Sequence, residues 1–134
     1  MTKIIDIEGI GPKYSELLIN AGIETTDVLL EKCATPELRA ALASELDVTE
    51  KMLLEWANRA DLMRISGVGE EYSDLLEAAG VDTVVELGGR VAANLHAKMI
   101  EVNEEKELVR AVPSLNDVED WVSQAKSMDR AIHY

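Results

Sequence analysis

A repeated segment constrains this chain more than any other feature of its sequence. Residues 7–25 return 58 residues later as residues 65–83, with the glycines, a tyrosine, two adjacent leucines and an Ala-Gly pair at matching positions. A weaker echo links residues 53–57 to residues 118–122 at an offset of 65, so the second copy holds about seven extra residues. We expect this insertion between Gly88 and Pro113, and we expect a duplicated structural unit.

Each copy has the patterning of helices. A proline before a periodic apolar stretch and a glycine after it predict a helix over about residues 12–21. Other helix starts are predicted at Thr35 before Pro36, at Thr49 (to about Met63), at Thr83 in a capping box with Glu86, and at Ser114 (to about Met128). No stretch alternates as a strand does. We therefore predict an all-α fold of two tandem repeats packed as one pseudo-symmetric compact domain.

The repeats are predicted to span residues 1–64 and residues 65–134. A full helix precedes the second hairpin, whereas the first hairpin has only residues 3–7 before it. The helix with Trp121 echoes the helix with Trp56 and lies at the other end of the chain. We expect this C-terminal helix to pack beside residues 4–18 and close the two repeats, so that deleting residues 114–134 unfolds or oligomerises the chain.

The chemistry of the repeat lies in its Gly-hydrophobic-Gly turn. Glycines permit backbone angles that a side chain forbids, and a helix begins directly after the turn. Unpaired N–H groups and the positive end of the helix dipole at such a start can seat a phosphate or a carboxylate. The alternative is that the glycines only make a tight turn between helices, and the turn alone leaves both interpretations open.

These residues also carry a resemblance. Ile-x-Gly-Ile-Gly-Pro-Lys-Tyr at residues 7–14 resembles the hairpin signature of helix-hairpin-helix proteins, a superfamily of DNA repair enzymes, polymerases and ribosomal proteins whose turn grips the nucleic-acid backbone through main-chain amides. Nearly the whole chain resembles a bacterial family of tandem helix-hairpin-helix proteins known as a domain of unknown function. The further segments that carry this resemblance are residues 34–37, the Trp56 helix, residues 62–69, residues 102–106 and the Trp121 helix. It implies a fold and no activity.

The resemblance transfers unevenly to the two hairpins. The residues that match the phosphate-gripping pattern, and form the candidate anion site, are Gly9, Ile10, Gly11 and Lys13. The second hairpin has Gly67, Val68 and Gly69, followed by Glu70 and Glu71 in place of Pro12 and Lys13. Two carboxylates oppose an anion there but stabilise the start of a helix. We therefore interpret the second hairpin as structural.

Charge separates the classes of function. The chain has 13 basic and 26 acidic residues, a formal net charge of −13, and both halves share the bias. Such a field repels polyanions at long range and disfavours contact along a nucleic-acid backbone. The favoured hypothesis is a non-enzymatic binding or scaffold module for an unidentified protein partner. The alternative is nucleic-acid binding through the first hairpin.

Nothing in the sequence predicts catalysis, a cofactor or a metal site. His96 and His133 lack metal-ligand spacing, and Cys33 has Lys32 beside it, which could lower its pKa slightly, but no base can be inferred. The acidic cluster Glu101, Glu104, Glu105 and Glu107 is interpreted as a solvated helix face, and the tyrosines and tryptophans as core. No apolar run spans a bilayer and no secretory signal is recognised, so a cytoplasmic location is expected.

Overall fold

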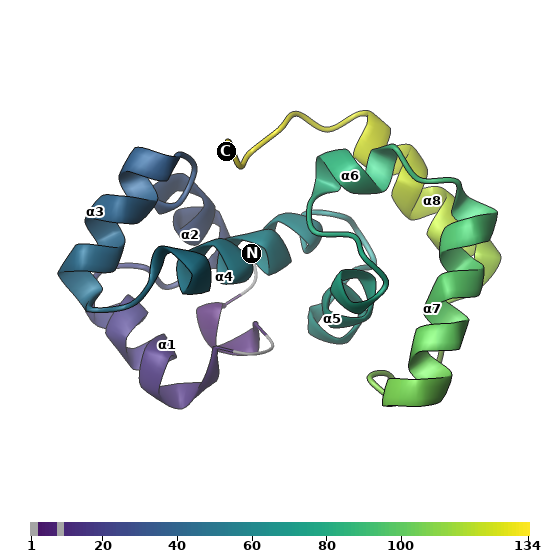
Figure 1. The fold of residues 1–134 in the computed structure, drawn as a ribbon, viewed down its shortest axis with the longest axis horizontal. Coiled ribbons are helices and arrows are strands. Elements are labelled where there is room, and N and C mark those ends of the chain that lie inside the picture. The colour runs from purple at the N-terminus through teal and green to yellow at the C-terminus, as the bar shows by residue number, and fades with distance from the viewer. Residues whose placement is uncertain (1–2, 8–9) are drawn as a thin grey trace. The chain divides into compact units, whose positions relative to one another are not determined.

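A computed structural model describes residues 3–7 and 10–134, and Figure 1 shows an all-helical fold. A short 3-10 helix, Ile4–Asp6, precedes eight α-helices in the described part of the chain. These are α1 (Gly11–Asn20), α2 (Thr26–Lys32), α3 (Pro36–Leu46), α4 (Glu50–Leu62), α5 (Glu70–Ala78), α6 (Val84–Gly88), α7 (Ala92–Lys106) and α8 (Leu115–Lys126). One isolated β-bridge, Lys3 with Thr25, is the only β pairing within the described ranges. The predicted all-α class is confirmed.

Hydroxyl caps define most helix starts where the sequence predicted them. The side chains of Thr35, Thr49, Thr83 and Ser114 each accept a hydrogen bond from a backbone N–H three residues on. Ser114 forms a full capping box, because the carboxylate of Asp117 accepts from the Ser114 N–H. The predicted box at Thr83 is shifted by one residue: the Glu86 carboxylate accepts from the N–H of Asp82, at 2.9 Å.

The helices divide into two compact units. Unit 1 comprises the chain up to Asp61 together with Arg130–Tyr134, and unit 2 comprises Leu62–Asp129. The boundary lies three residues before the one predicted at residue 64. The C-terminal helix α8 belongs to unit 2, and only the last five residues of the chain belong to unit 1.

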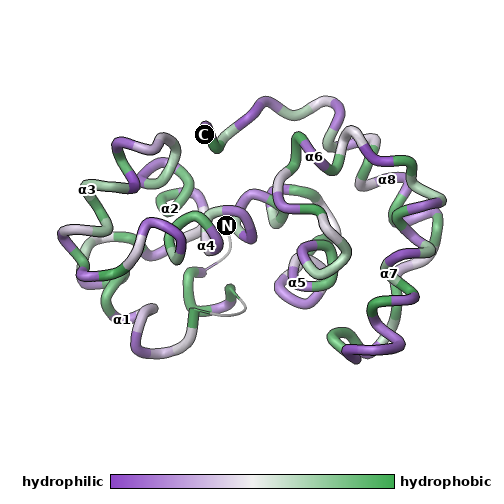
Figure 2. Tube along the Cα trace, in the orientation of Figure 1, coloured by the Kyte–Doolittle hydropathy of each residue, from purple (hydrophilic) through white to green (hydrophobic). Residues whose placement is uncertain are grey.

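Unit 1 is built around an aromatic contact between its first and last helices. Tyr14 of α1 and Trp56 of α4 lie with ring centroids 5.3 Å apart and planes tilted by 48°. Figure 2 shows polar and apolar residues following one another in short blocks along the helices, so that each can turn an apolar face inward. The fully buried large side chains of this unit are Ile4, Leu18, Ile23, Leu29 and Leu53.

Residues 130–134, which we call the C-terminal strap, cover the corner where α2 leads into α3. The N–H of His133 donates to the carbonyl of Ala34 at 2.8 Å. The buried guanidinium of Arg39 donates to the carbonyls of Cys33 and His133, each at 2.8 Å. Ile132 is 1% exposed. The strap is therefore an integral part of unit 1.

Unit 2 contains an aromatic contact of the same geometry. Tyr72 of α5 and Trp121 of α8 have ring centroids 5.3 Å apart and planes tilted by 50°. Helix α8 packs on α6 and α7. It approaches α6 so closely that a Cβ on Gly88 would lie 3.3 Å from the backbone nitrogen of Lys126. The fully buried large side chains here include Leu62, Ile65, Leu75, Leu76, Leu87, Leu95 and Met99.

Trp121 thus lies in the core of unit 2, and the expected packing of its helix beside residues 4–18, which would join the two units, stays a prediction. Within unit 1, Trp56 already supplies the ring that Tyr14 requires, and Tyr72 takes Trp121 within unit 2. Because each repeat contains its own tyrosine and its own tryptophan, each closes on itself. The same tyrosine–tryptophan contact is therefore formed inside each unit.

The turn before α5 gives a test of this packing. Gly67 has a φ of +98°, and a Cβ built on it would lie 3.0 Å from the Trp121 Nε1, whereas Gly69 has a φ of −99° and open space around it. We expect Gly67→Ala to lower the free energy of unfolding by about 1–3 kcal/mol in a urea titration followed by circular dichroism. Gly69→Ala is the matched control and should remain close to the parent protein. Equal effects of the two substitutions would contradict the tight contact.

Candidate functional site

The first hairpin is the candidate anion site from the sequence, and the structure describes three of its four residues, because Gly9 lies outside the described ranges. Ile10 is buried, and its N–H donates to the carbonyl of Ile7 at 3.4 Å, so this amide serves the turn. Gly11 begins α1 with a φ of +77°, and the N-cap residue Ile10 forms no side-chain cap to this helix. Lys13 is exposed, and its amine lies 5.4 Å from the centroid of the Tyr14 ring. Of the predicted residues, Gly11 and Lys13 thus lie in the first turn of α1.

The second hairpin is held from α8. The side-chain amide of Gln124 both accepts from the Ser66 N–H, at 2.9 Å, and donates to the Ser66 carbonyl, at 3.1 Å. The Trp121 ring lies where a side chain at Gly67 would point, and the N–H of the buried Val68 donates to the Ile65 carbonyl at 3.1 Å. The N–H and carbonyl of Ser66 and the N–H of Val68 thus all have hydrogen-bond partners within the unit. The exposed Glu70 and Glu71 follow in the first turn of α5, with Gly69 as its N-cap.

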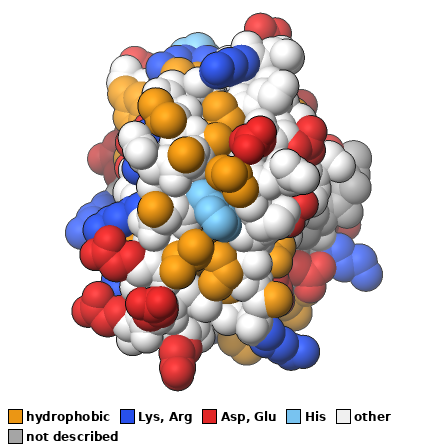
Figure 3. Space-filling view, turned by 90° about the vertical axis from the view of Figure 1, so that its right-hand side faces the viewer, with side chains coloured by type: hydrophobic (Ala, Val, Ile, Leu, Met, Phe, Trp, Pro, Cys, Tyr) orange, Lys and Arg blue, Asp and Glu red, His pale blue; other side chains and the backbone are white. Residues whose placement is uncertain are grey.

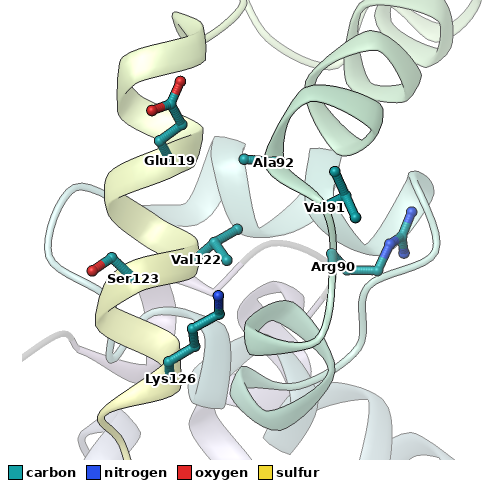
Figure 4. Close-up of a pocket in the computed structure, with 7 residues that line it drawn as sticks. All are labelled: Arg90, Val91, Ala92, Glu119, Val122, Ser123 and Lys126. Atoms are coloured by element: carbon teal, nitrogen blue, oxygen red, sulfur yellow. The ribbon is translucent and has the colours of Figure 1, made fainter.

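A groove lies between α8 and the turn that leads into α7, and sequence reasoning missed it. It has a volume of about 410 Å³ and is lined by Arg90, Val91, Ala92, Glu119, Val122, Ser123 and Lys126. Figure 4 shows Val122 directed toward the α7 side, the Lys126 amine beside it, and Arg90 reaching away from α8. Val91, which lines the groove with Arg90 and Lys126, is 63% exposed. The groove joins an apolar floor to two cations, Arg90 and Lys126, and one carboxylate, Glu119.

The groove continues into an apolar face on α7 and the start of α8. His96 and Ile100 are four residues apart on α7 and so share a face. The Nε2 of His96 lies 2.8 Å from the carbonyl of Pro113, which brings the start of α8, with Leu115, next to that face. Ile100 is 37% and Leu115 38% exposed. Figure 3 shows apolar side chains gathered around an imidazole on this side, with carboxylates toward its edges. We call Val91, His96, Ile100 and Leu115 the α7–α8 face.

The sequence contains a weak signal for this face. Ile100 stands among polar residues on a helix whose core positions are already filled by Leu95, Met99 and Val102. A surplus apolar residue on a helix is compatible with either burial or exposure, and only the packing decides between them. The pattern alone therefore does not predict the face.

Comparison with known proteins gives one match. The family described as Domain of unknown function (DUF4332) matches residues 8–128 of the chain. The chain belongs to this family. No curated protein and no solved structure matched it. The family name carries no activity, so the chemistry of the DUF4332 chain must be argued from its own residues.

The remaining chemical groups of the DUF4332 chain have structural surroundings. His96 lies on α7, and the acidic cluster of Glu101, Glu104, Glu105 and Glu107 is exposed, with Lys98 paired to Glu101 at 3.8 Å. A search of the described residues finds no group of three or more His, Cys, Asp or Glu side chains able to hold a metal ion. The same residues contain no helix long and apolar enough to cross a membrane.

Cys33 corrects a detail of the sequence interpretation. The neighbouring Lys32 was expected to lower the pKa of the thiol slightly, but Cys33 is fully buried. Desolvation by burial raises its pKa to about 11, and the Arg39 guanidinium offsets only part of that effect. Burial outweighs charge here because the neutral thiol needs no hydration.

The buried thiol predicts a reactivity. The thiolate is the nucleophile, so a rise in pKa from 9.0 to about 11 lowers the reactive fraction at pH 8. We expect the folded DUF4332 chain to react with iodoacetamide at least ~10-fold more slowly than the same chain in denaturing urea, as measured by mass spectrometry. Equal rates in the two states would show that Cys33 is accessible.

Proposed function

We propose that this chain is a non-enzymatic module that binds another protein, and that the α7–α8 face is the binding surface. The observation that carries the proposal is the exposure of three apolar side chains in unit 2, Val91 at the N-cap of α7, Ile100 within α7 and Leu115 at the start of α8. Clustered apolar side chains with a charged rim are typical of protein interaction sites. The face offers apolar packing around His96, whose Nε2 lies within hydrogen-bond distance of the Pro113 carbonyl, and this arrangement favours binding over catalysis.

We further propose that units 1 and 2 are tandem helix-hairpin-helix repeats related by pseudo-symmetry. The two Tyr–Trp contacts, with equal separations and closely similar tilts, support this relation. So do the matching turn bonds, from Ile10 to Ile7 and from Val68 to Ile65. The hairpin then acts chiefly as the packing element that positions the last helix of its unit.

Charge and geometry favour a protein over a nucleic acid as the partner. The net charge is −13, and Glu70 with Glu71 begins the helix after the second hairpin. The start of α1, where Ile10 forms no side-chain cap and Gly11 and Lys13 follow, supports the alternative that the first hairpin binds an anion such as a nucleic-acid phosphate. A single helix start in an acidic protein supplies few of the cationic contacts that tight nucleic-acid binding needs.

A titration with DNA separates the two candidates. We expect no binding of duplex or single-stranded DNA tighter than about 1 μM near physiological salt, because the long-range field is repulsive. Fluorescence anisotropy of labelled oligonucleotides measures this directly. Nanomolar binding that weakens steeply with added salt would overturn the favoured function. Amide shifts at Gly11 and Lys13 would then be expected to exceed those at Gly69 and Glu71.

Affinity capture with matched variants tests the binding face. Ile100 and Val85 are similarly exposed, at 37% and 40%, but Val85 lies on α6 and outside the α7–α8 face. From a nuclease-treated extract of the source cells, Ile100→Glu should lose protein partners that the parent chain and Val85→Glu retain, because a buried carboxylate at an apolar contact is costly. Retention of the same partners by Ile100→Glu, or their loss on nuclease treatment, would contradict the proposal.

A further inference from the structure

The C-terminal strap shows what one corner of the repeat can hold. In unit 1 an extended segment crosses the corner between α2 and α3, its Ile132 buried and its His133 N–H bonded to Ala34. Arg39 fixes the segment through the His133 carbonyl. The interaction thus combines a buried β-branched side chain with two main-chain hydrogen bonds. This is a common way for a folded domain to hold an extended peptide.

The helix starts place the same corner of unit 2 at the groove. The N-cap residues of α3 and α7 are Thr35 and Val91, so Thr35 and Pro36 correspond to Val91 and Ala92, which line it. Because α7 begins at Ala92 and α3 at Pro36, the residue two before the helix is Ala34 in unit 1 and Arg90 in unit 2. Arg90 also lines the groove. The α2–α3 corner of unit 1 therefore matches the wall of the groove that leads into α7.

The opposite wall of the groove corresponds as well. At the offset of 65, Val122, Ser123 and Lys126 of α8 match Ala57, Asn58 and Asp61 of α4. Two residues of the unit 1 corner are less exposed than their counterparts at the groove of unit 2.

Thr35 is half-buried and Asp61 is 1% exposed, whereas Val91 is 63% exposed and Lys126 is also exposed. In unit 1 the corner is covered, and in unit 2 its counterpart is open.

We propose that the groove of unit 2 binds an extended peptide segment from a partner protein, with a β-branched apolar side chain against Val91 and Val122 and a neighbouring carboxylate near Lys126. The apolar side chain of the peptide would be buried on the floor of the groove, as Ile132 of the strap is buried in unit 1. Lys126 stands where unit 1 has the carboxylate Asp61, so the preferred charge of the occupant at this point is negative. This inference rests on the proposed function, and it names the class of partner.

A peptide with the sequence of the strap is a direct probe. We use the acetylated and amidated peptide Asp-Arg-Ala-Ile-His-Tyr, the sequence of residues 129–134, with the full-length ¹⁵N-labelled chain. Saturable amide shifts are expected at Val91, Ala92, Val122 and Ser123. The same peptide with serine in place of isoleucine should bind at least ~10-fold more weakly, because the apolar anchor supplies most of the affinity.

Variants of the exposed groove residue complete the test. Val91→Glu should weaken binding of the probe by ~10-fold or more, and Val85→Glu should leave it unchanged. Both positions are exposed, and thermal unfolding of the two variants checks that each remains folded. Absence of shifts at millimolar peptide, or shifts confined to Ala34 and Arg39 as the probe displaces the strap, overturns the inference.

The two proposals can fail separately. Capture that depends on Ile100, without binding of the probe at Val91, refutes the peptide groove and leaves the binding module in place. Binding of the probe at Val91, without capture that depends on Ile100, supports the groove and refutes the wider α7–α8 face. Identical affinity of the isoleucine and serine peptides refutes the apolar anchor and with it the inference.

Discussion

The contact between a tyrosine on the first helix and a tryptophan on the last helix of each unit is the interaction on which the remaining structure depends. Tyr14 meets Trp56, and Tyr72 meets Trp121, at the same 5.3 Å separation. Such a pair contributes about 0.5–1.5 kcal/mol beyond the burial of its surface. Its larger effect is geometric, since it fixes the hairpin to the helix that closes the unit.

The consequence of this contact is clearest at the second hairpin. Trp121 comes so close to Gly67 that a side chain at this turn would collide with its indole nitrogen, and Gln124, three residues along α8, binds both polar groups of Ser66. The N–H and the carbonyl of Ser66 are therefore both bonded from the closing helix of the same unit. Glu70 and Glu71 follow this turn as exposed residues in the first turn of α5, where carboxylates stabilise the start of a helix.

Local chemistry made much of the fold predictable. Hydroxyl caps at Thr35, Thr83 and Ser114 satisfy backbone donors wherever the chain goes next, so they mark helix starts from sequence alone. The partner of Trp121 was not predictable in this way, because the pattern shows that the ring is buried but not which tyrosine it meets. The groove beside Val91 was also missed. Exposure of an apolar residue depends on what covers it, and the cover in unit 1 comes from residues far along the chain.

The extra residues of the second copy have a structural use. Asp47 and Glu107 end α3 and α7 in the same left-handed conformation, with φ values of 56° and 51°, and they lie 60 residues apart. Their offset shows that most of the insertion lies after them, in the connector to α8.

That connector is pinned at three points: Asn103 binds Val109 through both of its amide atoms, Tyr72 donates to the carbonyl of Ala111, and His96 bonds Pro113. A connector held in this way brings the start of α8 beside the exposed side of α7. The first copy, with a shorter connector, covers its own corner with the strap. In unit 2 the longer connector thus accompanies exposed apolar side chains at Ile100 and Leu115, whereas in unit 1 the strap bonds to the corner between α2 and α3.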